Sequence, residues 1–238
     1  MSKHDQIAGS LIEDILSGRY RPTERLPSER DLSARFDANR GAVREAMKKL
    51  EQIGLAEVQP GGARVKQAEE ATLDVLGPML AQGHVPDAQL LDQIMLVISQ
   101  LMSLAAQQTL EVATQEEIDH IRSLVRPIIE EDLDREQHTL ARFELMQTIM
   151  LRSNNLPLQI IARSLFEQVA PHTAPLYPHI VVDQEAYRIF GRQLDTALRE
   201  RDQTALRATF TEFSDLNRRS MVRAIDAMHT QGQEAKTS

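Results

Sequence analysis

Hydrophobic residues in the first quarter of the chain recur at helical spacing over three short stretches. Ile7, Leu11 and Ile15 mark the first stretch, which predicts a helix of about four turns. Residues 28–36 and 39–53 carry two more such patterns, each beginning with a polar residue suited to N-capping. Three short helices with a tight turn between the second and third predict a helix-turn-helix.

The period of the pattern changes after the third predicted helix. Residues 55–58 and 63–66 alternate as strands do, and the turn-forming residues 59–62 lie between them. A hairpin directly after the third helix is the arrangement of a wing, so residues 1–67 predict a winged helix-turn-helix domain. Residues 68–71 are interpreted as a linker.

Only helical patterns follow, and they predict a mostly α chain whose second domain, residues 72–230, is an all-α bundle. The three prolines within residues 171–178 predict a loop or broken turn, and residues 231–238 predict a flexible polar tail. The predicted helices are 72–82, 87–110, 115–131, 136–153, 155–170, 183–201 and 203–229.

Composition excludes several classes of protein. The 238-residue chain is 42% hydrophobic and 26% charged, which is the balance of a soluble globular protein. It has no cysteine, so disulfides, thiolate metal sites and cysteine nucleophiles are excluded. No uninterrupted apolar stretch approaches membrane-spanning length and the N-terminus lacks a signal-peptide pattern, so we expect a cytoplasmic protein with no membrane partner.

Charge is distributed unevenly along the chain. The net charge is −8, yet residues 19–49 contain nine basic and five acidic residues, a local balance of +4 that leaves −12 for the remainder. The predicted helix-turn-helix is therefore basic within an acidic protein, and the overall charge does not argue against nucleic-acid binding.

The third predicted helix combines an apolar face with a cationic one. Arg40, Arg44 and Lys48 are spaced i, i+4, i+8 and share the side opposite the apolar residues. Such a helix fits the major groove, where arginine can donate two hydrogen bonds to guanine. Asn39 and Gly41 lie at its N-terminal end, where backbone N–H groups can face phosphate.

Neighbouring residues strengthen the DNA-binding interpretation. Arg30 precedes the turn, Gly61 and Gly62 would let the wing approach a duplex, and Arg64 lies on the second wing strand. A cationic row alone is more often a solvated helix surface, but the combination with the turn and the wing favours DNA binding. The hypothesis requires these cations to be free to enter the grooves.

Three segments carry a resemblance to a known family. LPSERDL at 26–32, NRGAVREA at 39–46 and LEQIGL at 50–55 resemble the winged-helix signature of the GntR family of bacterial transcription regulators. The resemblance implies that Arg30, Arg40 and Arg44 contact operator DNA and that Gly61 reaches the minor groove. Asp37 departs from the family, which usually has glycine in that turn.

The helical remainder is similar to the FadR subfamily, whose C-terminal bundle binds an effector and in many members a metal. At the metal-ligand positions this chain has Leu140, Glu144, Gly191 and Phe213, and its seven histidines show no ligand spacing. One carboxylate without imidazole does not make a transition-metal site, so we expect no metal and no other cofactor. The resemblance implies a small-molecule effector, an acyl-CoA or an organic acid.

Two helix faces are candidates for an effector pocket, although aromatic residues at helical spacing are more often plain core. If both faces point inward, the pocket would be lined by Leu140, Glu144, Gln147, Phe210, Phe213 and Asn217.

The leading hypothesis is a homodimeric transcription regulator, a repressor whose affinity for a pseudo-palindromic operator changes when an effector binds. An enzyme is disfavoured because the sequence has no nucleotide-binding, metalloprotease or nucleophile-elbow motif, so no catalytic residue is assigned. The alternative is a helical protein-interaction module with a DNA-binding head and no small-molecule effector.

Overall fold

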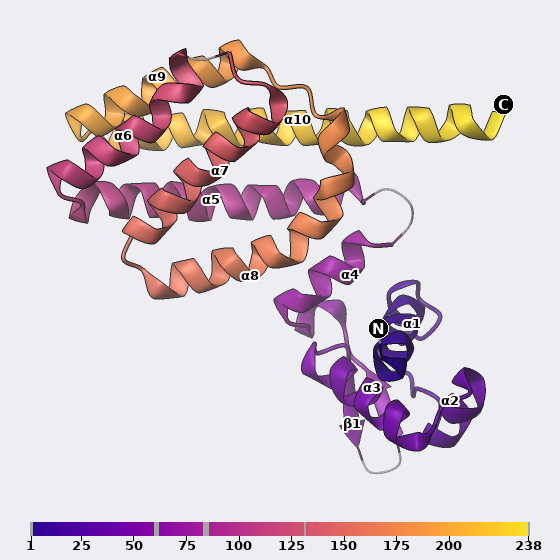
Figure 1. The fold of residues 1–238 in the computed structure, drawn as a ribbon. Coiled ribbons are helices and arrows are strands. Elements are labelled where there is room, and N and C mark those ends of the chain that lie inside the picture. The colour runs from indigo at the N-terminus through magenta and orange to yellow at the C-terminus, as the bar shows by residue number, and fades with distance from the viewer. Residues whose placement is uncertain (1, 60–61, 83–85, 131, 238) are drawn as a thin grey trace. The chain divides into compact units, whose positions relative to one another are not determined.

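A computed structural model describes residues 2–59, 62–82, 86–130 and 132–237, without the side chains of 231–237. The chain divides into two compact units, residues 1–84 and 85–238 (Figure 1). Each unit has its own hydrophobic core. The predicted fold class, a winged helix-turn-helix followed by an all-α unit, is confirmed.

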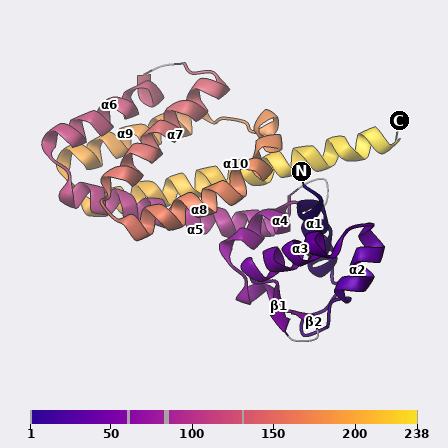
Figure 2. The same cartoon turned by 60° about the horizontal axis from the view of Figure 1, so that its bottom comes forward.

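The N-terminal unit begins with the three predicted helices, α1 (Lys3–Leu16), α2 (Glu29–Phe36) and α3 (Arg40–Gln52) (Figures 1 and 2). The side chain of Ser28 accepts a hydrogen bond from a backbone N–H of α2, and that of Asn39 does the same for α3, so both predicted N-caps are present.

The conformation of the turn between α2 and α3 accommodates Asp37 at the position where the resemblance leads us to expect glycine. Asp37 ends α2 in the left-handed conformation, with φ of 45° and ψ of 60°. Glycine adopts this conformation at least cost and aspartate tolerates it, so the chain forms the tight turn with aspartate in place of glycine.

The wing consists of β1 (Ala56–Gln59) and β2 (Gly62–Val65), paired antiparallel (Figure 2). A third segment lies along the other edge of β2, because the N–H of Thr23 donates to the carbonyl of Val65 (2.8 Å) and that of Leu26 to the carbonyl of Ala63 (2.9 Å). The sequence did not predict this segment, since prolines on either side of it obscure any strand pattern.

Residues 68–80 pack with the N-terminal unit. They form two 3-10 turns (Ala68–Glu70 and Leu73–Val75) and α4 (Leu76–Leu80), and Val75 is 4% exposed within the core of the N-terminal unit. This position differs from the predicted boundaries, which place a linker at 68–71 and the start of the helical domain at 72.

The end of α3 is held against this segment. The N–H of Thr72 donates to the carbonyl of Ile53 (3.0 Å), and a Cβ on Gly54 would lie 2.9 Å from the Cα of Ala71. Gly54 also has a positive φ of 78°, so glycine serves both the helix end and the close backbone approach.

The second unit consists of long helices whose bounds follow the prediction closely (Figure 1). Its main core joins α5, α6, α7, α9 and α10, with one residue of α8. The helices are α5 (Ala88–Val112), α6 (Gln115–Glu130), α7 (Arg135–Arg152), α8 (Leu156–Thr173), α9 (Gln184–Glu200) and α10 (Gln203–Thr237).

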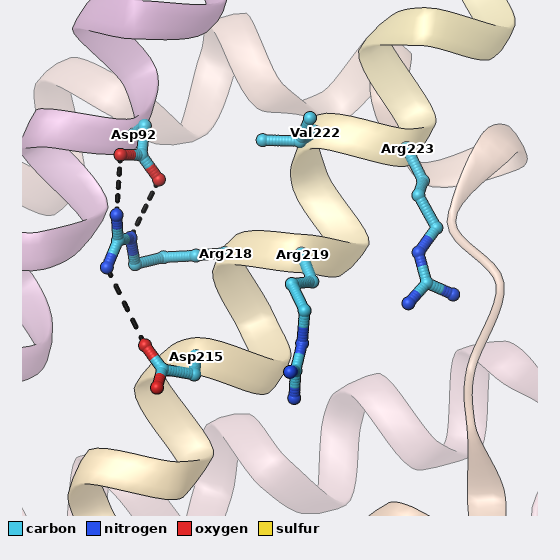
Figure 3. Close-up of a pocket in the computed structure, with 6 residues that line it drawn as sticks. All are labelled: Asp92, Asp215, Arg218, Arg219, Val222 and Arg223. Carbon is cyan, nitrogen blue, oxygen red and sulfur yellow. Dashed lines mark hydrogen bonds and ion pairs between the residues drawn. The ribbon is translucent and has the colours of Figure 1, made fainter.

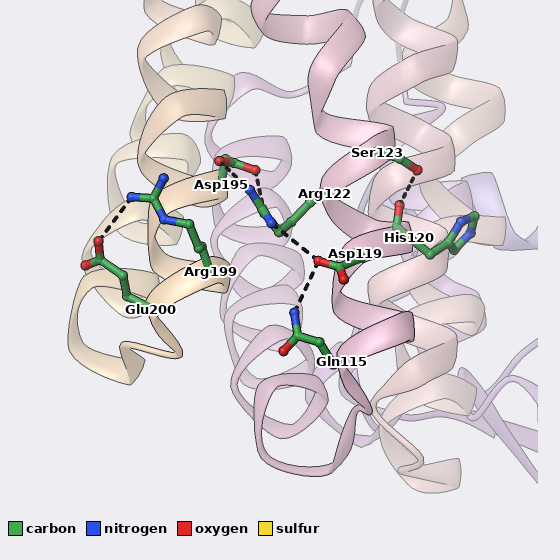
Figure 4. Close-up of polar contacts among 8 residues, drawn as sticks. All are labelled: Gln115, Asp119, His120, Arg122, Ser123, Asp195, Arg199 and Glu200. Carbon is green, nitrogen blue, oxygen red and sulfur yellow. Dashed lines mark hydrogen bonds and ion pairs between the residues drawn. The ribbon is translucent and has the colours of Figure 1, made fainter.

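Polar contacts hold α6 beside α9 (Figure 4). The guanidinium of Arg122 donates through Nε to Asp195 (2.8 Å) and also reaches Asp119 (3.3 Å) on its own helix. In the core, the rings of Phe190 on α9 and Phe213 on α10 stack with centroids 4.2 Å apart.

Two predicted irregular segments are more regular than expected. Helix α8 continues through Pro171 to Thr173, and a 3-10 helix (Ala174–His179) follows where the prolines predict a loop. Residues 231–237, predicted as a polar tail, continue α10; Gln, Glu, Ala and Lys in this stretch are good helix formers.

Helix α5 is long and apolar enough, by length and composition alone, to cross a membrane. It packs against α10, α7 and α8, and its Leu91, Ile94 and Leu110 are buried, whereas Leu96, Val97 and Leu104 are exposed.

Candidate nucleic-acid interface and ligand site

The cationic face of α3 lies at the surface of the N-terminal unit. Val43 and Leu50 are fully buried against the core, whereas Arg40, Arg44 and Lys48 are exposed on the opposite side. The structure thus brings together the three cations that the spacing predicts, on a helix held by its apolar face.

Most of these cations have acidic neighbours within the unit. Arg44 contacts Glu29 (2.9 Å) and Lys48 contacts Glu45 (2.8 Å), while Arg40 has no side-chain partner among the described residues. Arg30 lies 3.7 Å from Asp31 and its side chain is 83% exposed.

These ion pairs do not bury the cations. The side chains of Arg44 and Lys48 are 64% and 68% exposed, and ion pairs at the surface are weak because water screens them. A duplex phosphate or base edge can therefore compete with the acidic neighbour for these side chains.

The N-terminal end of α3 leaves room for a close approach. The Asn39 side chain accepts from the N–H of Ala42 (2.8 Å), and a Cβ on Gly41 would lie 3.2 Å from that amide oxygen. Glycine at 41 therefore keeps the cap unstrained, and the exposed first turn has free backbone N–H groups of the kind that bind phosphate.

The wing differs from the prediction in one respect. Arg64 donates through Nη1 to the carbonyl of Thr23 (2.8 Å), which ties it to the neighbouring segment. Gly62 has a positive φ of 136° that suits a turn, while Gly61, the predicted wing tip, lies outside the described residues. The role of Arg64 and of both glycines in DNA binding stays a prediction.

In the helical unit, the predicted effector residues of α7 lie on the exposed side of the helix and not on the side that faces the core. Leu140 is 61% exposed, and Glu144 and Gln147 are exposed as well. The inward side of α7 instead carries His138, Leu145 and Ile149. Leu140, Glu144 and Gln147 cannot line an internal pocket from that position.

On α10, the predicted Phe210 and Phe213 are 2% and 8% exposed and belong to the core, as the alternative interpretation holds. Asn217 lies at the edge of this core and does meet a polar group. Its Oδ1 accepts hydrogen bonds from Arg142 (3.0 Å) and from the hydroxyl of Tyr187 (2.8 Å).

Arg142 is half-buried on α7 and forms no ion pair with a described residue. Its Nη1 donates to the Tyr187 hydroxyl (2.5 Å), its guanidinium carbon lies 4.4 Å from the Tyr187 ring centroid, and its buried Nε has no partner among the described residues. The hydrogen-bond partners of this half-buried guanidinium are thus neutral groups among the described residues.

His138 belongs, with Arg142, Tyr187 and Asn217, to one polar cluster in the helical unit. It is 3% exposed, its ring lies 4.5 Å from that of Tyr187, and neither ring nitrogen has a partner among the described residues. Burial, with the nearby charge of Arg142, lowers the pKa of His138 to about 4, so the ring is neutral at pH 7. The sequence prediction missed Arg142, His138 and Tyr187. His138 and Arg142 lie at helical spacing from the buried Leu145 and Ile149, and this pattern could have identified the two residues of α7.

A separate pocket of about 450 Å³ lies between α5 and α10 (Figure 3). Arg218 binds both carboxylate oxygens of Asp92 there (2.7 Å each), so its charge is already neutralised. The pocket is lined by Asp92, Asp215, Arg218, Arg219, Val222 and Arg223. Within the described parts of the chain, no three histidine or carboxylate side chains gather in a way that could hold a metal.

A winged helix-turn-helix with an exposed cationic third helix is the class that the N-terminal unit defines. Residues 3–65 match the family model of bacterial regulatory proteins, gntR family. The N-terminal unit is therefore a GntR-family helix-turn-helix domain, as the resemblance implies.

Two related proteins match this chain over different shares of its length. The chain is 36% identical over 84 residues to the HTH-type transcriptional regulator Rv0494 of Mycobacterium tuberculosis, a match that spans 35% of each protein. It is 26% identical over 179 residues to the galactonate operon transcriptional repressor of Escherichia coli, covering 71% of this chain and 77% of the repressor.

One solved structure is similar over nearly the whole chain. Lar, described as controlling the expression of the Listeria monocytogenes agr system, aligns with a TM-score of 0.55 and 17% identity over 94% of this chain and 97% of its own. At that identity the likeness establishes the fold alone.

Proposed function

We propose that the protein is a DNA-binding transcription regulator whose helical unit binds a small organic acid that changes operator affinity. The single observation that carries DNA binding is the exposed cationic face of α3 within a GntR-family domain. The two relatives described above are both named as transcription regulators or repressors, which supports this proposal.

Homodimerisation and repression are parts of the same proposal. Two copies of α3 related by a two-fold axis would read a pseudo-palindromic site, because symmetric proteins match symmetric half-sites. The galactonate operon relative is named a repressor, which supports repression by this chain.

DNA selection followed by a salt series tests this part. The protein is incubated with a random-sequence duplex library, and the enriched duplex is measured at 50 and 200 mM salt. With about six phosphate contacts, affinity should fall roughly 1,000-fold as counter-ions are released. Failure to enrich any duplex would overturn the proposal.

The organic-acid effector is supported by the environment of Arg142. A ligand carboxylate could supply the counter-ion that this guanidinium lacks, with the Tyr187 hydroxyl and the Asn217 amide beside it. Of the two ligands that the FadR resemblance implies, these groups favour an organic acid over an acyl-CoA. Binding would alter regulation by its different affinity for the two states of the protein.

Thermal unfolding with acetate, succinate and citrate tests the effector. At least one acid should raise the unfolding temperature of the wild type, and Arg142→Met should lose that shift. Sodium chloride at matched ionic strength is the control. If no acid among a wide set stabilises the wild type, the alternative of a protein-interaction module without an effector is favoured.

A further inference from the structure

Arg44 is held in place by a single, specific contact. Its Nε donates to both carboxylate oxygens of Glu29, each at 2.9 Å. Neither Nη1 nor Nη2 donates a hydrogen bond to any described residue. The carboxylate therefore takes one edge of the guanidinium and leaves the opposite edge free.

That free edge has the donors that base recognition requires. Arginine reads guanine by donating two parallel hydrogen bonds to O6 and N7, and two neighbouring Nη atoms can provide them. An arginine whose plane is already fixed loses less side-chain freedom when it binds than one that samples many rotamers.

The backbone position of Glu29 is fixed by helix α2. It is the first residue of α2, directly after the Ser28 cap, where the helix dipole favours a negative charge. Its side chain is 41% exposed, and the contact joins the two helices of the helix-turn-helix across 15 residues of sequence. The negative charge also disfavours the approach of a phosphate to this edge of Arg44.

We infer that Glu29 is a positioning residue for base recognition: it directs the free edge of Arg44 toward a base and away from the backbone. The inference rests on the proposed function, since it concerns how operator DNA is read. Glu29 would thus lower affinity for DNA in general while raising discrimination between sequences.

The test compares Glu29→Ala with Glu45→Ala, a matched control. Glu45 is an exposed acid on α3 that pairs with Lys48, so its removal deletes the same charge without touching Arg44. The probes are the duplex enriched by the wild type and a scrambled duplex of equal length.

For Glu29→Ala, we expect the ratio of affinities for enriched over scrambled duplex to fall about fivefold, while affinity for the scrambled duplex rises about twofold. Glu45→Ala should raise affinity for both duplexes and keep the ratio. Repeated selection with Glu29→Ala should relax one base position in each half-site, the same one that Arg44→Ala relaxes.

A wild-type ratio in Glu29→Ala, with an unchanged base preference, would overturn the inference while leaving the proposed function intact. If the wild type enriches no duplex, both fail together. In an Arg44→Ala background, Glu29→Ala should no longer change the ratio, and equal unfolding temperatures for all variants would exclude a general loss of structure.

Discussion

The two units use arginine in opposite ways. In the N-terminal unit, Arg40 and Arg44 are exposed on α3, and Arg44 pairs with Glu29. In the helical unit, the half-buried Arg142 donates hydrogen bonds to a phenol and an amide and forms no ion pair with a described residue. Exposed cations on a helix suit a large, hydrated polyanion, whereas a half-buried cation without an ion-pair partner suits one small anion.

Both kinds of arginine are expected to matter more for ligand binding than for folding stability. Removing an exposed arginine changes little in the folded protein, so its effect should be seen only with DNA present. Removing the half-buried Arg142 should change ligand binding while leaving stability without ligand close to that of the wild type.

The largest expected effect is on DNA. The double variant Arg40→Ala, Arg44→Ala should lower affinity for the enriched duplex about 100-fold, taking ~1.5 kcal/mol for each base contact. Its unfolding temperature should match the wild type, because both side chains are exposed. Lys3→Ala, an exposed cation on α1, is the control; equal losses in control and double variant would contradict recognition by α3.

The next effect concerns acid stability of the helical unit. The pKa of His138 lies at about 4 in the folded protein and near 6.5 when unfolded, so the unfolded chain binds more protons between these values. Stability should therefore fall by about 3 kcal/mol as the pH drops from 6.5 to 4. Urea unfolding of the wild type and of His138→Leu across this pH range measures the loss. If the free energy of unfolding depends on pH in the same way in both proteins, His138 is not the cause.

In the N-terminal unit, Arg35 forms an ion pair with a buried carboxylate, which Arg142 does not do with any described residue. Arg35 contacts Asp14 at 2.5 Å, and Asp14 is only 8% exposed. Burial raises the pKa of Asp14, but hydrogen bonds from Arg35 and Arg19 outweigh this and leave it below its usual value. Arg35→Met should cost about 1–2 kcal/mol, because Arg19 stays as a partner while one contact is lost. Unfolding of Arg35→Met in urea measures the cost, and no change would contradict it.

The smallest expected effect on stability is that of Arg142→Met. The change removes an unpaired charge and leaves the Tyr187 hydroxyl bonded to Asn217, so stability without ligand should stay within about 1 kcal/mol of wild type or rise. A loss as large as that of Arg35→Met would show that Arg142 is structural and would remove the basis for an anion site.

The N-terminal interface could be predicted because its signals are local. Caps at Ser28 and Asn39, and a cationic face opposite buried Val43, are set by residues a few positions apart. The fixed spacing of a helix places them without knowledge of distant contacts.

The site in the bundle could not be predicted in the same way, because α7 is apolar on two sides. Leu140, Phe143 and Leu151 are exposed, whereas Leu145 and Ile149 are buried, so the periodicity alone does not say which side faces the core. The partners of Arg142 come from α9 and α10, 45 and 75 residues away, and only the packing of the helices brings them together.

The packing of Val75 and α4 beneath α1 also determines where the chain can be divided. A fragment that stops at residue 67 would lose the buried Val75 and expose the apolar surface that Val75 covers. Exposed apolar surface promotes aggregation. A chimaera that joins this N-terminal unit to a different domain should therefore keep the chain through Leu80, so that the transferred unit retains its whole hydrophobic core.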